Sequence, residues 1–246
     1  MSFSRIRALT GRNIKEVVRD PLSLGFLYGL PVVMLVLFYV IFHKLTSQFE
    51  MRYLAPAMVG FGQAFITLFS GILIATDRSS SFMFRLYATR TKPTEFICGY
   101  SLAMLPSALS QAFIFFAAAV IVDVSFFSVN LLAALAFSVF TGSFYIAAGL
   151  LVGSLTTEKT VGGVSSFIVM AQSVLSGMWF PTEGLDGGFM KVMDVLPFKN
   201  ISRIMQNVCA GNYTFEGVWL PLIIICAYTL AVFVAAIAVF RRKMTK

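Results

Sequence analysis

Residues 22–42 read LSLGFLYGLPVVMLVLFYVIF, a run without a single charged side chain. A helix needs about 20 apolar residues to cross the ~30 Å hydrocarbon core of a bilayer, so this run is long enough to span it. Similar uncharged runs follow along the rest of the chain. They predict six transmembrane helices in all, at residues 22–42, 53–76, 96–122, 131–153, 160–182 and 217–240.

The composition supports a membrane protein. Of the 246 residues, 58% are hydrophobic and 12% are charged, whereas a soluble domain carries about 25% charged residues. This excludes soluble globular, disordered, collagen-like and disulfide-scaffold proteins. The apolar runs are continuous rather than alternating, and backbone groups in lipid must bond internally, so helices are expected and not barrel strands. The predicted fold class is an all-α integral membrane protein with a single transmembrane domain over residues 1–246.

The distribution of basic residues predicts the orientation. Fourteen of the nineteen Lys and Arg residues lie in the N-terminal segment, the loops after spans two and four, and the C-terminal tail. Positively charged loops stay on the cytoplasmic side, so we expect both termini in the cytoplasm, most simply at a bacterial inner membrane. The net charge of +8 is spread over short loops, which favours contact with membrane lipid and disfavours a nucleic-acid partner.

The N-terminal residues 3–20 have the pattern of an interfacial amphipathic helix. Pro21 disfavours helix at Asp20 and marks the turn into the membrane. At 100° per residue, one face carries Phe3, Ile6, Leu9, Ile14 and Val17, and the opposite face carries Arg5, Arg12, Lys15 and Arg19. The helix is either a basic anchor that fixes topology or a surface helix that also contacts a cytoplasmic partner.

Residues 183–216 form the longest segment between predicted spans and are expected outside. Ile201, Ile204, Met205 and Val208 are spaced as one face of a helix, whereas Asn200, Arg203 and Asn207 point elsewhere. We expect two short re-entrant or surface helices here. The alternative is an ordinary external loop with one amphipathic turn.

Few residues in this sequence support catalysis. There is no G-x-x-x-x-G-K-[ST] motif for ATP, and the single histidine, His43, allows neither a catalytic triad nor a histidine metal centre. No ionisable residue lies deep in a predicted span, which argues against proton coupling. Gln63, Gln111 and Gln172 do lie at membrane depth, and each needs another helix or a cavity as its partner.

Two stretches resemble a known family. Residues 77–100, DRSSSFMFRLYATRTKPTEFICGY, resemble the first cytoplasmic loop of type-2 ABC exporter permeases. The residues in register are Asp77, Arg78, Leu86, Thr89, Glu95 and Gly99. Residues 175–181, LSGMWFP, followed by Leu196 and Pro197, resemble the end of the family's fifth span. Residues 53–56, YLAP, resemble the start of its second span. The loop departs from the family at Ser81-Phe82, where the family has Gly-Thr, and at Arg90, where it has proline.

The resemblance implies a permease subunit that is not itself an enzyme. Two permeases, identical or homologous, would work with two ABC ATP-binding subunits that hold ATP and Mg²⁺, so this chain would have no catalytic, cofactor or metal residue. Residues 3–20 would be a connecting helix and residues 77–95 a loop carrying a short coupling helix. The implied ATPase-coupling residues are Asp77, Arg78, Phe82, Arg85, Leu86 and Glu95.

The resemblance also implies an outer gate, formed by the re-entrant helices and by Trp179, Phe180, Pro181, Leu196 and Pro197. The aromatic residues among them fit an interfacial aromatic belt equally well. The expected substrate is hydrophobic or amphipathic, either a drug or antibiotic or a lipid-like molecule. The alternatives are a non-transporting membrane anchor or assembly subunit, and a passive channel.

Overall fold

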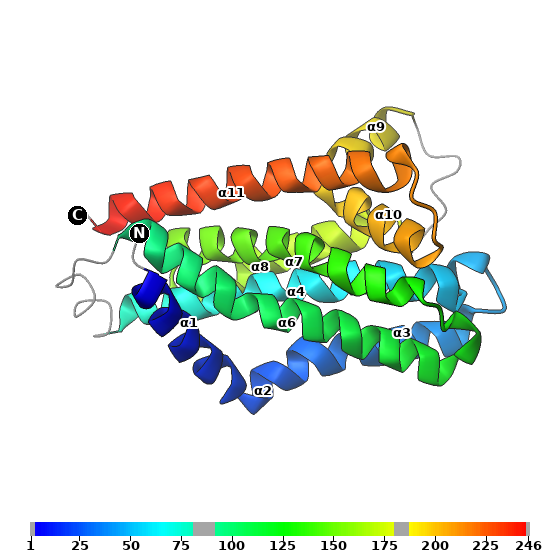
Figure 1. The fold of residues 1–246 in the computed structure, drawn as a ribbon, viewed down its shortest axis with the longest axis horizontal. Helices are drawn as coiled ribbons and strands as arrows, with labels where there is room; N and C mark the ends of the chain where they lie inside the picture. Colours follow the sequence, from blue (N-terminus) through cyan, green and yellow to red (C-terminus); the bar gives the residue numbers. More distant parts are fainter. Residues whose placement is uncertain (1–2, 81–91, 180–186, 245–246) are drawn as a thin grey trace.

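The computed structural model describes residues 3–80, 92–179 and 187–244, and these residues form helices without any strand (Figure 1). The amphipathic N-terminal helix is α1 (Phe3–Val18). The first predicted span is built from α2 (Pro21–Leu24), the π-helical η1 (Gly25–Gly29) and α3 (Leu30–Phe42). The remaining elements are η2 (Ser47–Phe49), α4 (Met51–Ser79), α6 (Pro93–Val122), η3 (Val124–Phe126), α7 (Asn130–Leu155), α8 (Glu158–Leu175), α9 (Gly187–Val195), α10 (Pro197–Cys209), η4 (Phe215–Trp219) and α11 (Leu220–Met244).

The central helix of the bundle is α4, which packs against α6, α7, α8 and α10. Its contact with α7 is tight, because a Cβ on Gly153 would lie 2.3 Å from the carbonyl oxygen of Gly71. Small residues let helix backbones approach closely, and Gly149 and Gly153 serve this packing within the chain. The bundle core therefore depends on glycine as well as on apolar side chains.

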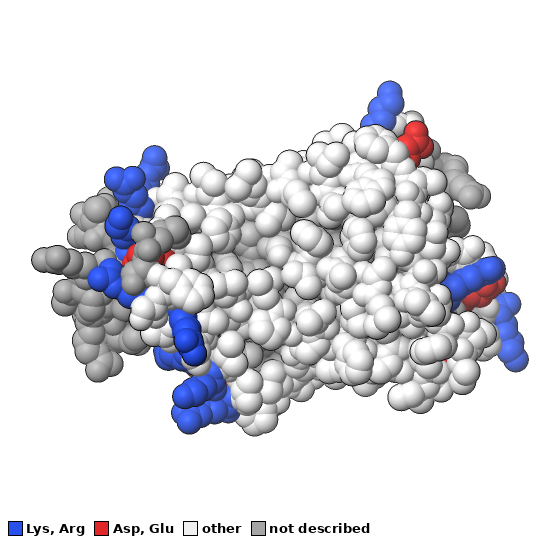
Figure 2. All heavy atoms as spheres, in the orientation of Figure 1, with Lys and Arg blue, Asp and Glu red and all other residues white. Residues whose placement is uncertain are grey.

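Charged side chains gather at the two ends of the bundle, and a broad uncharged band lies between them (Figure 2). Within the described residues, five helices are long and apolar enough to cross a membrane: Pro21–Phe42, Met51–Ser79, Pro93–Val122, Asn130–Leu155 and Phe215–Arg242. The predicted all-α membrane class is confirmed. We call the end that holds both chain termini the termini end and the other the opposite end (Figure 1).

The predicted fifth span, residues 160–182, corresponds to α8. Its predicted end is wrong, because the helix stops at Leu175 and Gly177 adopts a positive φ of 71°. Glycine accepts this left-handed conformation without strain and ends the helix. With 18 residues and a polar first turn, α8 is not among the five apolar helices, so a count of six spans stays a prediction.

The turn before the first span follows the sequence prediction. Pro21 is the first residue of α2, and Asp20 caps it by accepting a hydrogen bond from the Ser23 amide at 3.1 Å. The helix then passes through the π-helical η1, where the Leu27 carbonyl oxygen accepts a hydrogen bond from Gln111 Nε2 at 2.8 Å. A glutamine of α6 therefore stabilises the irregular backbone of the first span.

The predicted pair of short helices in residues 183–216 is α9 and α10. Ile201, Ile204, Met205 and Val208 are buried as one face of α10, as predicted. Asn200 is also buried, at 2% exposed, because it donates to the carbonyl oxygens of Asp194 and Leu196, and the sequence did not predict this contact. These carbonyl groups lie at the end of α9 and in the turn after it, where they have no donor within their own helix. The Asn200 amide supplies that donor.

Candidate functional site

Two buried acidic side chains lie at the termini end, one on each side of residues 81–91. Asp77 is in the last turn of α4 and Glu95 is in the first turn of α6, and they are 2% and 1% exposed. Helix α4 has 29 residues and is about 43 Å long, so its last turn extends past a ~30 Å hydrocarbon core. A buried carboxylate needs charged or hydrogen-bonding partners, and α1 supplies them for both residues.

Asp77 is held by a bidentate pair with Arg12 of α1. Arg12 Nη2 lies 2.6 Å from Asp77 Oδ1, and Arg12 Nη1 donates to Oδ2. The Tyr100 hydroxyl of α6 donates to the same carboxylate. One carboxylate thus joins α1, α4 and α6, in the two-pronged geometry that guanidinium and carboxylate groups favour.

Glu95 is held by its own helix start and by α1. It accepts a hydrogen bond from the Lys92 amide at 3.1 Å, which caps α6, and its Oε2 lies 3.6 Å from Arg5 Nη1. Arg5 and Arg12 therefore contact the two acidic residues that flank residues 81–91. We call this set, Arg5, Arg12, Asp77, Glu95 and Tyr100, the ionic junction.

The backbone of α1 also packs closely on α6. A Cβ on Gly99 would lie 2.8 Å from Leu9 Cβ, and the Thr10 hydroxyl donates to the Gly99 carbonyl oxygen at 3.2 Å. Leu9 and Asn13 are buried in this contact. Helix α1 is thus part of the bundle as well as an amphipathic surface helix.

The sequence placed Arg5 and Arg12 on the basic face of the helix but did not predict that they pair with acidic residues of α4 and α6. Arg12 extends along the helix surface to a buried carboxylate, and a long arginine side chain can bury its stem while keeping its charge paired. Sequence reasoning missed this role because it placed the basic face by helical angle alone. The available signal was the pair of acidic residues at the ends of two predicted spans, which needed cationic partners.

Arg78 follows Asp77 in α4, and its side chain caps the C-terminal end of α7. Its Nη1 donates to the carbonyl oxygens of Gly153, Ser154 and Thr156 at 2.6, 2.7 and 3.2 Å. These are the last carbonyls of α7 and the turn after it, which have no partner within their own helix. Arg78 thus fastens the end of α7 to the end of α4, beside the ionic junction.

The other implied coupling residues, Phe82, Arg85 and Leu86, lie outside the described residues. The described implied residues, Asp77, Arg78 and Glu95, all contact other elements of this chain. They position the two ends of the predicted coupling loop on α1, α4, α6 and α7.

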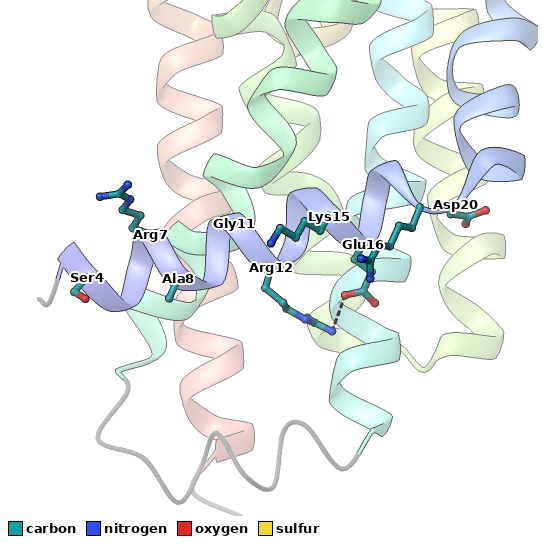
Figure 3. A pocket seen from close by; sticks show the side chains of 9 residues that line it. Ser4, Arg7, Ala8, Gly11, Arg12, Lys15, Glu16 and Asp20 are labelled. Atoms are coloured by element: carbon teal, nitrogen blue, oxygen red, sulfur yellow. Dashed lines mark ion pairs between the residues drawn. The ribbon is translucent and has the colours of Figure 1, made fainter.

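The outward face of α1 carries an open hollow of about 830 Å³ (Figure 3). Arg12 forms an ion pair with Glu16, one turn further along α1, at 2.6 Å. A dashed line marks this pair in Figure 3. Burial raises the pKa of Glu16, and the charge of Asp77 raises it further, whereas Arg12 lowers it. The hollow is lined by Ser4, Arg7, Ala8, Gly11, Arg12, Lys15, Glu16, Arg19 and Asp20.

At the opposite end, Trp179 lies in an aromatic cluster with Phe38, Phe42, Phe49 and Phe61. Its ring centroid is 4.4 Å from that of Phe38, and its Nε1 donates to Ser173 Oγ at 2.6 Å. Phe180 and Pro181 lie outside the described residues. Leu196 and Pro197 form the start of α10, where Pro197 is buried at its first position.

The three intramembrane glutamines are buried between helices. Gln63 donates to the Ser138 carbonyl oxygen and accepts from the Thr141 hydroxyl, which ties α4 to α7. Gln172 of α8 accepts from the Tyr145 hydroxyl and donates to Ser202 at 3.4 Å. Gln111 bonds Leu27 as described above. Each has another helix as a partner, one of the two alternatives that the sequence left open.

The fold and this site define an all-α integral membrane protein whose N-terminal helix holds both ends of one interhelical loop. Residues 4–209 match the model of the ABC-2 type transporter family, and this match covers most of the chain. The chain therefore belongs to that family, and it is an ABC transporter permease subunit. No curated protein matches the chain.

Proposed function

We propose that this chain is the permease subunit of an ATP-driven exporter, and that the ionic junction transmits movement from an ATP-binding partner to the membrane helices. Energy enters at the predicted coupling helix, which the sequence places at residues 78–90 and of which Arg78 and Ser79 belong to the last turn of α4. The substrate is hydrophobic or amphipathic, of the drug, antibiotic or lipid-like kind. It is moved outward across a bacterial inner membrane, with both termini in the cytoplasm.

The observation that carries this proposal is that α1 holds both ends of the predicted coupling loop. Arg12 binds Asp77 where the loop leaves α4, and Arg5 contacts Glu95 where it joins α6. A force on the loop then acts on α1, α4 and α6 together rather than on one flexible connection. An ATPase can do work on a permease only through contacts that differ between two states, and rigid elements that move together carry such a difference.

The partners in this proposal are two ABC ATP-binding subunits and a second permease, identical or homologous. The chain has no P-loop of its own, so ATP and Mg²⁺ belong to the partner subunits. A membrane anchor would recruit a partner without stimulating its ATP hydrolysis, and a passive channel would conduct without ATP.

Co-purification and ATP hydrolysis test the proposal together. A tagged permease in mild detergent should bring down an ATP-binding subunit whose hydrolysis is stimulated by transport substrate. The double variant Arg5→Gln/Arg12→Gln should still bind the subunit but lose most of that stimulation. The matched control Arg52→Gln, which breaks an exposed pair with Glu50 at the opposite end, should keep it. Absence of any ATP-binding subunit from the purified complex would overturn the proposal.

A further inference from the structure

A narrow cleft lies between the corner that joins α1 to α2 and the flank of α4. Its volume is about 190 Å³. Leu24 and Leu27 of the first span form one wall, and Phe69, Ile72 and Leu73 of α4 form the other. Typical drug sites measure roughly 300–1,000 Å³, so this cleft holds only one end of an amphipathic molecule. The rest of such a molecule would stay in lipid.

The charged residues in the described lining of the cleft are both acidic. Glu16 and Asp20 both line it, together with the hydroxyl groups of Ser23 and Thr76. Arg12 is the cation beside Glu16, and its single positive charge is shared with Asp77. Arg12, Glu16 and Asp77 together carry one net negative charge. The described lining of the cleft adds Asp20 and no basic residue, whereas the adjoining hollow adds Arg7, Lys15 and Arg19.

Three other basic residues of α1, Arg7, Lys15 and Arg19, line the open hollow on its outward face, where Figure 3 labels Arg7 and Lys15. The described lining of the cleft contains none of the three. Glu16 and Asp20 contribute to both surfaces. An apolar cleft with carboxylates at its mouth attracts a cation with an apolar body, and it repels a phosphate or carboxylate headgroup.

We propose that this cleft binds the cationic end of a hydrophobic monocation, with the ammonium group facing Glu16 and Asp20 and the apolar body against Phe69 and Leu73. The inference rests on the proposed exporter function and names the substrate class of that function as lipophilic amines and quaternary ammonium compounds. The position, at the termini end of α4, fits loading from the cytoplasmic leaflet.

The backbone at the cleft supports a binding role. Leu27, in one wall of the cleft, belongs to the π-helical η1 and is 1% exposed. Isolated π-helical turns occur frequently at functional sites. Here the turn is held by Gln111, so the wall of the cleft is defined by a specific hydrogen bond.

Photolabelling of the purified permease in lipid nanodiscs tests the proposal. The probe is an octyl-trimethylammonium with a diazirine on its chain, and two analogues carry a hydroxyl or a sulfonate head on the same chain. We expect the cationic probe to label residues 16–27 and 69–76, as mapped by mass spectrometry, and the two analogues to label them far less. Equal labelling by the hydroxyl analogue would overturn the proposal.

Two isosteric variants locate the charge. Glu16→Gln should weaken labelling about three- to fivefold, as for the loss of one partly exposed ion pair, and Asp20→Asn should weaken it less, because Asp20 is exposed to solvent. Both replacements keep an oxygen that accepts the hydrogen bond from Arg12 or from the Ser23 amide, and asparagine caps a helix as well as aspartate does. Glu50→Gln at the opposite end is the control and should leave labelling unchanged. Unchanged labelling in the Glu16→Gln/Asp20→Asn double variant would also overturn the proposal.

Acidification gives an independent readout, because the quaternary probe does not titrate. Labelling should fall as the pH drops through the raised pKa of Glu16. The charged groups around Glu16 are Arg12, Asp77 and Asp20, together with Arg7, Lys15 and Arg19 of the adjoining hollow. The labelling assay contains no ATP-binding subunit, so it tests cation binding in the cleft even if the exporter proposal fails. Cation-specific labelling without ATP-driven transport would refute only the function, and transport without cation-specific labelling would refute only the cleft.

Discussion

At the scale of single residues, the Arg12–Asp77 pair should show an asymmetry between its two partners. Arg12→Gln leaves the buried Asp77 carboxylate without its cation. The free energy of unfolding should fall by about 3 kcal/mol or somewhat less, since Arg12 is partly exposed. Asp77→Asn should cost about 1–2 kcal/mol, because the amide still accepts from Arg12 and Tyr100, and Arg12 keeps Glu16. Thermal unfolding in detergent measures both.

The double variant Arg12→Gln/Asp77→Asn sharpens this prediction. It should be more stable than Arg12→Gln alone, because the second change removes the unpaired charge. If the stability lost by the double variant, relative to wild type, equals the sum of the two single losses, the two residues act independently and the ionic junction is not a unit.

Glycine packing in the core gives a second residue-scale prediction. Gly153→Ala places a methyl group 2.3 Å from the backbone of α4, so α4 and α7 must separate at a cost of about 1–3 kcal/mol. Gly163→Ala on α8 meets no atom within 4 Å and is the matched control. Thermal unfolding of both variants should show a loss only for the first, and equal melting temperatures would contradict the close contact.

At the scale of elements, the aromatic cluster of Phe38, Phe42, Phe49, Phe61 and Trp179 joins α3, η2 and α4 to the segment after α8. If residues 179–181 form an outer gate, Trp179→Ala/Phe180→Ala should lower substrate transport more than membrane insertion. Quantified protein in the membrane and transport in vesicles at matched amounts separate the two. Normal transport by a well-expressed double variant would favour the aromatic belt.

The elements differ in how far the sequence determined them. Long uncharged runs predicted the apolar helices well, because lipid allows few other structures. The end of α8 was missed because the span was drawn through the uncharged residues 176–182, SGMWFPT, although glycine and proline are helix-ending residues. The positive φ of Gly177 shows where the turn lies. The inward turn of Asn200 was missed because it depends on carbonyl groups of α9, which no periodicity reports.

The site was harder to predict than the fold. The family resemblance identified Asp77, Arg78 and Glu95, but their partners Arg5, Arg12 and Tyr100 are distant in sequence. Arg12 and Asp77 are 65 residues apart, and a single sequence has no signal for such a pair. The structure adds that α1 is the element that joins them.

At the scale of the whole molecule, the orientation predicts which end faces the cytoplasm. Cys209 is a poor reporter, because burial raises its pKa to about 12 and leaves little thiolate at neutral pH. Leu45→Cys, at a position 73% exposed at the opposite end, is better placed. In a cysteine-free background on intact cells, an impermeant maleimide should label it.

The matched control is Ser79→Cys, an exposed position in the last turn of α4. It should react only after the membrane is opened. Labelling of the Ser79→Cys variant but not of Leu45→Cys on intact cells would reverse the orientation.

The central claim is that an ATP-binding subunit drives this permease through residues 78–90, and one measurement tests it most directly. Phe82 and Leu86 are four residues apart, so they would share one face of the predicted coupling helix, and we predict that they are its apolar anchors in the partner. ATP hydrolysis and substrate transport should be measured in the same reconstituted vesicles, at matched subunit amounts, for Phe82→Asp/Leu86→Asp. We predict that the inserted variant loses ATPase association or stimulation, and transport with it. Full hydrolysis and full transport in that variant would contradict the account.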